Sequence, residues 1–211
     1  MIPANDLLLF ALSALVLVIS PGPNMVYLIS RSITQGRIAG MISLASVLSG
    51  FLFHIVMVSF GLTALLFAVP VAYSVLKTAG VLYLLYLAYQ AVKPGSKSIF
   101  EANTGLPKDK PARLFMIGFL TNVLNPKVAV FYLSFFPQFI KPAYGSVMLQ
   151  SLQLGFTQII VSCSINFIIV LTASKLAIFF NKNPGWLKMQ KWFMASVLTA
   201  LAMKMALSKA K

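Results

Sequence analysis

Long apolar segments follow one another along almost the whole of this chain, and they constrain its fold more than any other feature. Six of them are separated by more polar connections, and they cover residues 7–30, 38–60, 71–92, 114–140, 147–173 and 189–207. A helix of about 20 apolar residues spans the hydrocarbon core of a membrane. Only 9% of the residues are charged, against about 25% in a typical soluble domain. We therefore expect an all-α integral membrane protein with about six transmembrane helices.

The basic residues are distributed unevenly among the connections. Eleven of the 17 Lys and Arg residues fall in the first, third and fifth connections, namely Arg31, Arg37, Lys93, Lys97, Lys108, Lys110, Arg113, Lys175, Lys182, Lys188 and Lys191. Lys and Arg concentrate in the cytoplasmic loops of membrane proteins. This predicts cytoplasmic odd-numbered connections and outward-facing termini, and it explains the net charge of +14 without a nucleic-acid partner. The basic C-terminal tail opposes the last step, and the C-terminus would be cytoplasmic if the last segment did not span.

The third connection divides the chain into two similar parts. We expect a first three-helix repeat in 1–92, a basic cytoplasmic loop in 93–113 and a second three-helix repeat in 114–211. An odd number of spans per part makes the second repeat run opposite to the first. Inverted repeats of this kind are common in secondary transporters.

Proline interrupts the first apolar segment of each part at a corresponding place. Proline removes a backbone donor and clashes with the preceding turn, so each of these helices is expected to be broken. Breaks at matching positions in the two parts are a sequence indication of a substrate site near the membrane midplane. Ordinary proline kinks are the alternative. The residues expected to bind substrate are Pro21, Gly22, Pro23, Asn24, Asn125, Pro126 and Lys127.

Lys127 lies near the middle of the fourth segment. A Lys at the centre of a membrane helix costs about 2.5–3.5 kcal/mol on insertion scales, so it usually faces a partner or a cavity. Asp6, Glu101 and Asp109 are the only acids in the chain, and a permanent carboxylate partner is therefore scarce. Two interpretations stay open: Lys127 binds a substrate carboxylate, or it is held by carbonyls that the proline frees.

Three other ionisable residues are candidates for proton coupling: His54, Asp6 and Lys77. His54 is the side chain most easily protonated near neutral pH, although a neutral, packed histidine is the alternative. Lys77 has an alternative too, since a long side chain can extend to the interface. His54 belongs to a row of mostly small residues that predicts a close contact between helices: Gly36, Gly40, Ser43, Val47, Gly50, His54, Met57 and Gly61.

The fifth segment has one apolar and one polar side. Leu149, Leu152, Phe156, Ile159, Cys163, Phe167 and Val170 share the apolar side, and Gln150, Gln153, Thr157, Gln158, Ser162, Ser164 and Asn166 share the other. Since polar groups are costly against lipid, the polar side should face the bundle, either for hydrogen bonds between helices or around a cavity. The expected cavity-lining residues are Gln153, Thr157, Gln158 and Asn166.

The residues around the two breaks also resemble the lysine-exporter (LysE/RhtB) family of amino-acid exporters. The similar motifs are Pro21-Gly22-Pro23-Asn24 with Gly36-Arg37-x-Ala39-Gly40, Leu76-Lys77-x2-Gly80-x2-Tyr83-Leu84, and Phe119 to Lys127 followed by Phe135-x-Pro137-Gln138-Phe139. The resemblance implies six spans, a bacterial inner-membrane location and proton-driven export of amino acids, and it is strongest toward the homoserine/threonine-exporter branch. The chain departs from the family pattern at Ser46 and Ala88, where glycine is expected, and at Phe51, where many members are polar or acidic.

The expected function is therefore secondary active export of amino acids or derivatives such as homoserine and threonine. No GxxxxGK[ST] sequence for ATP is present. An exporter of metal cations is the alternative, although one His and one Cys leave few ligands. We expect no enzymatic activity and no cofactor, since no catalytic set is visible and Cys163 stands alone. The expected partners are the amino-acid substrate and the lipid bilayer, and a homodimer is compatible with the sequence.

Overall fold

The computed structural model describes residues 1–20, 22–59, 70–94 and 108–207, and each element in these ranges is helical. The helices are α1 (Ala4–Ile19), α2 (Pro23–Met57), α4 (Pro70–Val92), α5 (Pro111–Val123), α6 (Pro126–Val130), α7 (Val147–Lys182) and α8 (Pro184–Leu207). Between α6 and α7 lie a π-helical segment (Phe131–Phe135) and two short 3₁₀ helices (Phe136–Phe139 and Pro142–Tyr144).

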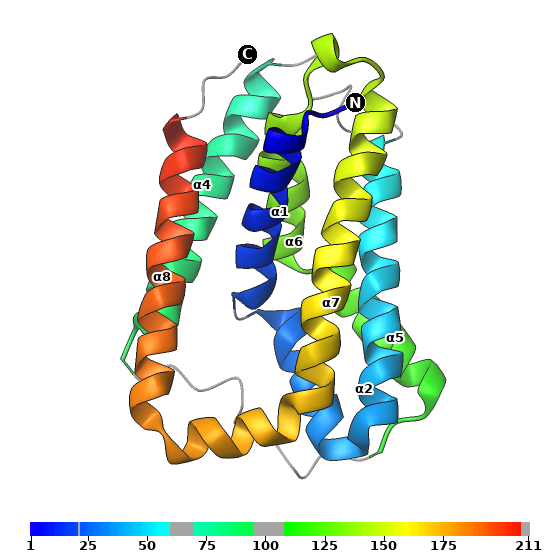
Figure 1. Cartoon of the computed structure of the whole chain (residues 1–211), viewed down its shortest axis with the longest axis vertical. Coiled ribbons are helices and arrows are strands. Elements are labelled where there is room, and N and C mark those ends of the chain that lie inside the picture. The colour runs from blue at the N-terminus through cyan, green and yellow to red at the C-terminus, as the bar shows by residue number, and fades with distance from the viewer. Residues whose placement is uncertain (21, 60–69, 95–107, 208–211) are drawn as a thin grey trace.

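Both expected breaks are present in the structure. The predicted segment 7–30 consists of α1 and the first part of α2, and α2 starts afresh at Pro23. The segment 114–140 is divided in the same way, with α5 and the helix beginning at Pro126 bent by 44°. A proline in the first turn of a helix needs no backbone donor, which is why both second pieces begin at proline. Figure 1 shows the two broken helices running in opposite directions.

Helix ends differ from the predicted segments in three places. α2 continues through the expected connection at 31–37, where Gly36 (φ 85°, ψ 177°) turns the chain back on itself. α7 reaches Lys182 and α8 begins at Pro184, and α5 begins at Pro111. Hydropathy locates the apolar part of a helix, whereas backbone hydrogen bonding continues into turns whose side chains are charged.

The described helices pack in pairs. α2 lies against α5 and α7, α4 lies against α8, and α1 lies against α7. The α2–α5 contact is close because its residues are small. A Cβ atom on Gly50 would lie 2.5 Å from Asn122 Cβ, and one on Gly118 would overlap Ser46 Oγ. The expected row of small residues is thus a close contact at Gly50, whereas Met57 is half exposed and Gly61 lies outside the described residues.

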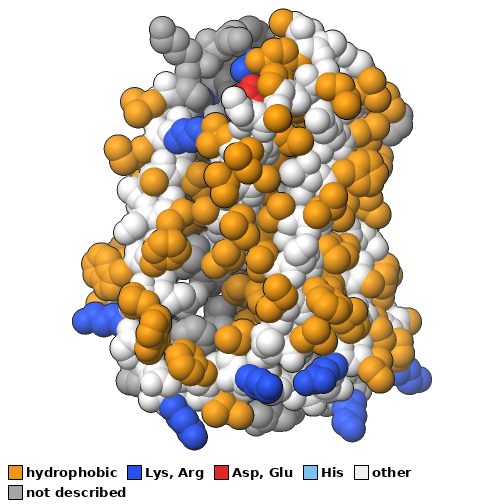
Figure 2. All heavy atoms as spheres, viewed as in Figure 1, with side chains coloured by type: hydrophobic (Ala, Val, Ile, Leu, Met, Phe, Trp, Pro, Cys, Tyr) orange, Lys and Arg blue, Asp and Glu red, His pale blue; other side chains and the backbone are white. Residues whose placement is uncertain are grey.

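The two ends of the molecule differ in charge. The turn at Gly36, the start of α5 and the α7–α8 corner lie at one end, here called the basic end. The N-terminus, the end of α8 and residues 140–146 lie at the opposite end, here called the terminal end (Figure 1). Lys and Arg gather at the basic end of the face in Figure 2, and the wall between the ends is largely hydrophobic.

The exposed wall is apolar at many positions. Leu82, Tyr89, Ile160 and Phe193 are each 63–65% exposed. Within the described ranges, α2 and α7 are long and apolar enough to cross a membrane, and the bent pair from Pro111 to Phe139 makes a third candidate span. α1 is apolar but shorter. These are the properties of a surface that faces lipid.

Candidate functional site

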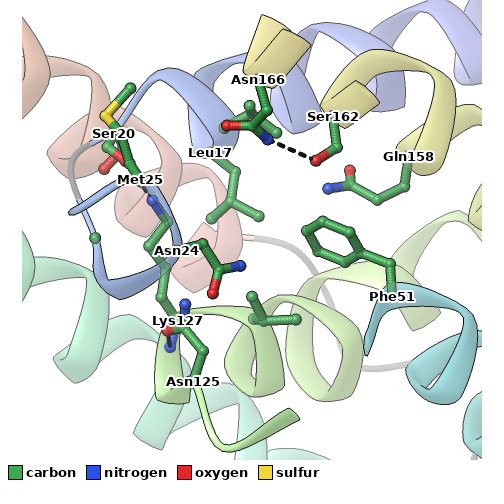
Figure 3. A pocket seen from close by; sticks show the side chains of 13 residues that line it. Leu17, Ser20, Asn24, Met25, Phe51, Asn125, Lys127, Gln158, Ser162 and Asn166 are labelled. Atoms are coloured by element: carbon green, nitrogen blue, oxygen red, sulfur yellow. Dashed lines mark hydrogen bonds between the residues drawn. The ribbon is translucent and has the colours of Figure 1, made fainter. Parts of the chain in front are cut away.

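The two helix breaks meet at a small buried cavity (Figure 3). Its lining residues are Leu17, Val18, Ser20, Gly22, Asn24, Met25, Phe51, Asn125, Lys127, Val128, Gln158, Ser162 and Asn166. The space open to the centre of a water molecule is ≈ 20 Å³, which is enough for about one water. The structure therefore describes a closed state, and a larger molecule would enter only after the surrounding helices move apart.

Lys127 connects the two breaks directly. Its backbone N–H donates to Asn125 Oδ1 at 3.0 Å, so Asn125 caps the helix that starts at Pro126. Its ammonium Nζ donates to the carbonyl oxygen of Ser20 at 2.5 Å, just beyond the end of α1. The side chain is only 7% exposed. The lysine of one broken helix is thus held by a carbonyl that the other break leaves free.

Lys127 Nζ also lies close to the N-terminus of α2. A Cβ atom on Gly22 would lie 3.2 Å from this nitrogen, and Gly22 is the N-cap of α2 without any side-chain cap. The N-terminus of a helix has a partial positive charge from its free N–H groups. A lysine beside such an end favours an anion, and a carboxylate has the matching charge and acceptors.

Carboxylates in the described part of the chain are paired elsewhere. Asp6 Oδ2 lies 3.0 Å from Lys141 Nζ, and Asp109 lies 2.7 Å from Arg31 and 3.2 Å from Arg113. No ion pair joins Lys127 to an acid among the described residues. The buried ammonium is therefore compensated by a backbone dipole and not by a full negative charge.

α7 supplies the opposite wall of the cavity. Gln158, Ser162 and Asn166 are buried there, and Asn166 Nδ2 donates to Ser162 Oγ at 3.0 Å. Both amide atoms of Gln158 and the Oδ1 atom of Asn24 are buried without a hydrogen-bond partner among the described residues. Polar atoms in that condition are rare and invite a ligand or water.

Two of the four expected α7 residues, Gln158 and Asn166, line the cavity, and the other two do not. Gln153 Oε1 instead accepts a hydrogen bond from the backbone N–H of Ile2 at 3.0 Å. Thr157 Oγ1 donates to the carbonyl of Gln153 at 2.8 Å. Ser164, expected on the polar side, is exposed. Its hydroxyl donates to the Ile160 carbonyl within the helix at 2.9 Å, so it needs no other partner.

The break residues have different positions around the cavity. Gly22, Asn24, Asn125 and Lys127 line it. Pro23 and Pro126 are exposed and begin their helices, so they shape the site without lining it. Pro21 lies outside the described residues.

The candidates for proton coupling lie away from the cavity lining. The His54 ring stacks on Tyr132 with centroids 5.1 Å apart, and its Nε2 is 3.5 Å from the Asn122 carbonyl oxygen. Asp6 pairs with Lys141 near the terminal end. Lys77 is half-buried on α4. Within the described ranges, no three His, Cys, Asp or Glu residues are grouped so as to hold a metal ion.

Sequence reasoning did not identify several lining residues. Ser20 and Met25 flank the first break, and Leu17 and Val128 lie one turn or less from the breaks. Their closeness in sequence to the prolines is the feature from which their place in the lining could have been predicted. Phe51 was noted only as a departure from a family pattern, and its place in the lining depends on how α2 folds back along α5.

Comparison with known proteins identifies the family of the chain. Residues 15–209 match the family described as LysE type translocator. The chain belongs to the LysE family. It is accordingly a membrane protein of the translocator class, as the motifs around the two breaks predicted. No solved structure matches it.

Among its relatives, this LysE-family chain is similar to two bacterial proteins named homoserine/homoserine lactone efflux protein. It is 31% identical to that of Salmonella typhi over 179 residues, 85% of this chain and 82% of the relative. It is 33% identical to that of Salmonella typhimurium over 152 residues, 72% of each chain. An uncharacterized membrane protein of Vibrio cholerae is 29% identical over 203 residues, 96% of this chain and 97% of the relative.

Proposed function

We propose that this LysE-family protein exports a neutral amino acid or a derivative, such as homoserine or threonine, across the bacterial inner membrane. The observation that carries the proposal is the position of Lys127. It is a buried cation where two broken helices meet, beside a helix N-terminus, with no ion-paired acid among the described residues. The names of the two Salmonella relatives support this class of substrate.

The substrate would be recognised at both of its charged groups. Its carboxylate would replace the Ser20 carbonyl as the partner of Lys127 Nζ and would also accept from the first N–H groups of α2. Its ammonium would bind the released Ser20 carbonyl and Asn24 Oδ1, an acceptor that is buried without a partner. A zwitterion is then bound without a protein carboxylate. Such a site is consistent with a chain that has only three acids.

Transport requires the site to open to each side in turn, and an inverted repeat would provide two related states. The packing supports this arrangement. If α1 to α4 and α5 to α8 are equivalent, the contact of α2 with α5 corresponds to that of α1 with α7, and both are present. The contact of α4 with the α6 region likewise corresponds to that of α1 with α8.

The proton gradient is the proposed energy source. A charge that crosses 100 mV supplies about 2.3 kcal/mol, which supports a concentration ratio of about fifty for each proton under tight coupling. His54 is the proposed coupling residue because it stacks on Tyr132, in the irregular helix that continues from Lys127. Protonation there would act on the same helix that holds the substrate lysine.

The test is export of labelled threonine or homoserine from loaded vesicles by four variants with matched protein levels. We expect Lys127→Gln to lose at least about tenfold in export rate, because a charge-assisted hydrogen bond is removed. Lys127→Arg should retain part of the parent's export rate, and Asn24→Ala should export more slowly than the parent. Lys175→Gln, which removes an exposed lysine at the basic end, is the control. Export by Lys127→Gln at the parent's rate would show that this lysine does not bind the carboxylate.

A further inference from the structure

Gln158 is the least satisfied side chain around the cavity. It is 0% exposed, and neither its Oε1 nor its Nε2 has a hydrogen-bond partner among the described residues. Figure 3 shows it extending from α7 between Phe51 and Ser162, on the side of the cavity away from Lys127. A buried amide without partners is costly, so a ligand that supplies a donor and an acceptor here is favoured.

Lys127 and Asn24 are the groups proposed to bind the α-carboxylate and α-ammonium of an amino acid, whereas Asn125, Ser162 and Asn166 have hydrogen bonds within the protein. Lys127 is the one charged residue in the described lining, and Asn24 Oδ1 is the acceptor for the ammonium. Ser20 Oγ, beside the first break, and the amide of Gln158, across the cavity, remain without partners among the described residues. Of these two, Gln158 lies where the side chain of a bound amino acid would extend. A cationic side chain would meet no acid in this lining.

Resting on the proposed function, we infer that Gln158 is the specificity-determining residue and binds a hydroxyl group on the substrate's side chain. A hydroxyl donates to Oε1 and accepts from Nε2, and thus satisfies both atoms. An apolar side chain of the same size leaves both unpaired. Sites built to hydrogen-bond a substrate hydroxyl reject analogues that lack it far more strongly than apolar pockets reject a methyl group. The substrates are therefore neutral hydroxy amino acids.

The experiment compares isosteric pairs: threonine with valine, and homoserine with norvaline. Export of each is measured from vesicles that contain the parent, Gln158→Met or Gln153→Met. We expect the parent to prefer the hydroxy member of each pair. Gln158→Met should lower that preference by at least about tenfold while export of valine and norvaline persists. Gln153→Met is the matched control, since the Gln153 amide already bonds Ile2 N and is outside the cavity lining.

The outcomes separate this inference from the proposed function. If the parent exports none of the four amino acids, the proposed function fails. If it exports them and Gln158→Met keeps the parent's preference, the role of Gln158 is wrong. Should Gln158→Met not reach the membrane, Gln158→Asn keeps an amide one methylene shorter. An unchanged preference with Gln158→Asn would likewise count against the inference, and a reduced one would support it.

A second inference comes from the two ends of the broken helices. At the basic end, Asp109 lies just before α5. Its carboxylate pairs at 2.7 Å with Arg31, which lies in the part of α2 that precedes Gly36. The Tyr27 hydroxyl donates to the Leu114 carbonyl at 2.5 Å in the same region. These contacts join the second piece of the first broken helix, at the start of α2, to the beginning of the second broken helix, at the start of α5.

The terminal end has a corresponding set of contacts. Asp6 in the first turns of α1 pairs with Lys141, which follows the end of the second broken helix, at 3.0 Å. The hydrogen bond to Asp6 raises the pKa of Lys141, which favours the charged form of this lysine. One turn further along α1, Phe10 packs edge-on against two rings of the second broken helix. Its ring centroid lies 5.7 Å from that of Phe136 and 5.2 Å from that of Phe139.

The two acids hold equivalent places in sequence, since Asp6 stands as far before Pro23 as Asp109 stands before Pro126. In each case the acid that begins one broken helix pairs with a base near the end of the other. We propose that the two ion pairs are the two gates of the cavity, Arg31–Asp109 toward the basic end and Asp6–Lys141 toward the terminal end. Breaking one pair opens the site to that side only.

The gates are tested by labelling a cysteine in the cavity with a membrane-impermeant thiol reagent. Ser162→Cys is placed in a chain with Cys163→Ser, since Cys163 is the only native cysteine. We expect Asp109→Asn to speed labelling from the basic side, and Asp6→Asn to speed it from the terminal side, each by about fivefold. Exchanging the partners, Asp6→Lys with Lys141→Asp, should restore slow labelling.

Two results would overturn the gates: acceleration from the same side by both substitutions, or rates equal to the parent's in both. Lys175→Gln, which removes an exposed charge from the basic end, should leave both rates unchanged. A charge exchange that folds but labels as fast as Asp6→Asn would show that the aspartate acts through some other contact than the pair.

Discussion

Lys127 shows what a single buried charge requires from its surroundings. The chain does not provide an ion-paired carboxylate among the described residues. It provides instead the Ser20 carbonyl of a neighbouring break. Of the two interpretations open from sequence, lysine held by a free carbonyl describes the closed state. The carboxylate-binding interpretation remains a proposal for the substrate-bound state, in which a substrate carboxylate replaces the Ser20 carbonyl at Lys127 Nζ.

His54 tests whether proton coupling acts through this region. We predict that His54→Ala flattens the pH dependence of export, because it removes an imidazole that titrates near neutral pH. His54→Phe, which keeps a ring on Tyr132 but has no titratable nitrogen, should flatten it too. The measurement is the export rate against pH at equal protein levels. If His54→Phe keeps the parent's profile, the histidine is a packing residue.

At the scale of helices, close approach depends on residues without bulk. α2 and α5 pack along the line where Gly50 meets Asn122 and Gly118 meets Ser46. Ser46, a departure from the family's glycine, thus contacts a glycine on the partner helix. The side-chain amide atoms of Asn122 have no hydrogen-bond partner among the described residues, so the side chain is positioned by this contact.

We predict that Gly50→Ala destabilises the protein by about 1–3 kcal/mol, as overpacking does. The added methyl would lie 2.5 Å from Asn122 Cβ, and the helices must separate to accept it. The measurement is the midpoint of thermal unfolding in detergent. Gly185→Ala is the control because a Cβ atom there meets nothing within 4 Å. Equal midpoints for the two variants would mean that α5 moves aside without cost.

At the scale of the whole molecule, charge and apolar surface are separated. Most of the Lys and Arg side chains on the face in Figure 2 lie at the basic end, and an apolar wall extends toward the other end. The positive-inside rule then predicts that the basic end faces the cytoplasm. Both described ends of the chain, near Met1 and Leu207, lie at the opposite end (Figure 1).

This orientation predicts the side from which introduced cysteines react. In a Cys163→Ser chain, Ser98→Cys, in the segment 97–110, should be labelled only from the cytoplasm. Ser146→Cys, between the second broken helix and α7, should be labelled only from outside. The assay is reaction of a membrane-impermeant thiol reagent with whole cells and with inverted vesicles. Labelling of both positions from one side would exclude the inverted repeat.

The sequence alone determined the class of the protein and the location of its breaks. Apolar length and proline act locally, through the cost of exposing polar groups to lipid and of removing a helical hydrogen bond. For this reason Pro23 and Pro126 begin new helices where the segments 7–30 and 114–140 were expected to break.

Only the tertiary structure decided which residues meet. The partner of Lys127 is Ser20, distant in sequence. Asp6 pairs with Lys141 and Asp109 pairs with Arg31, in each case across the two halves of the chain. Gln153 and Gln158 share a helix and a residue type, yet one bonds the N-terminal segment and the other lines the cavity. Helical periodicity gives the side of a helix on which a residue lies. Which neighbour occupies that side depends on how distant segments pack together.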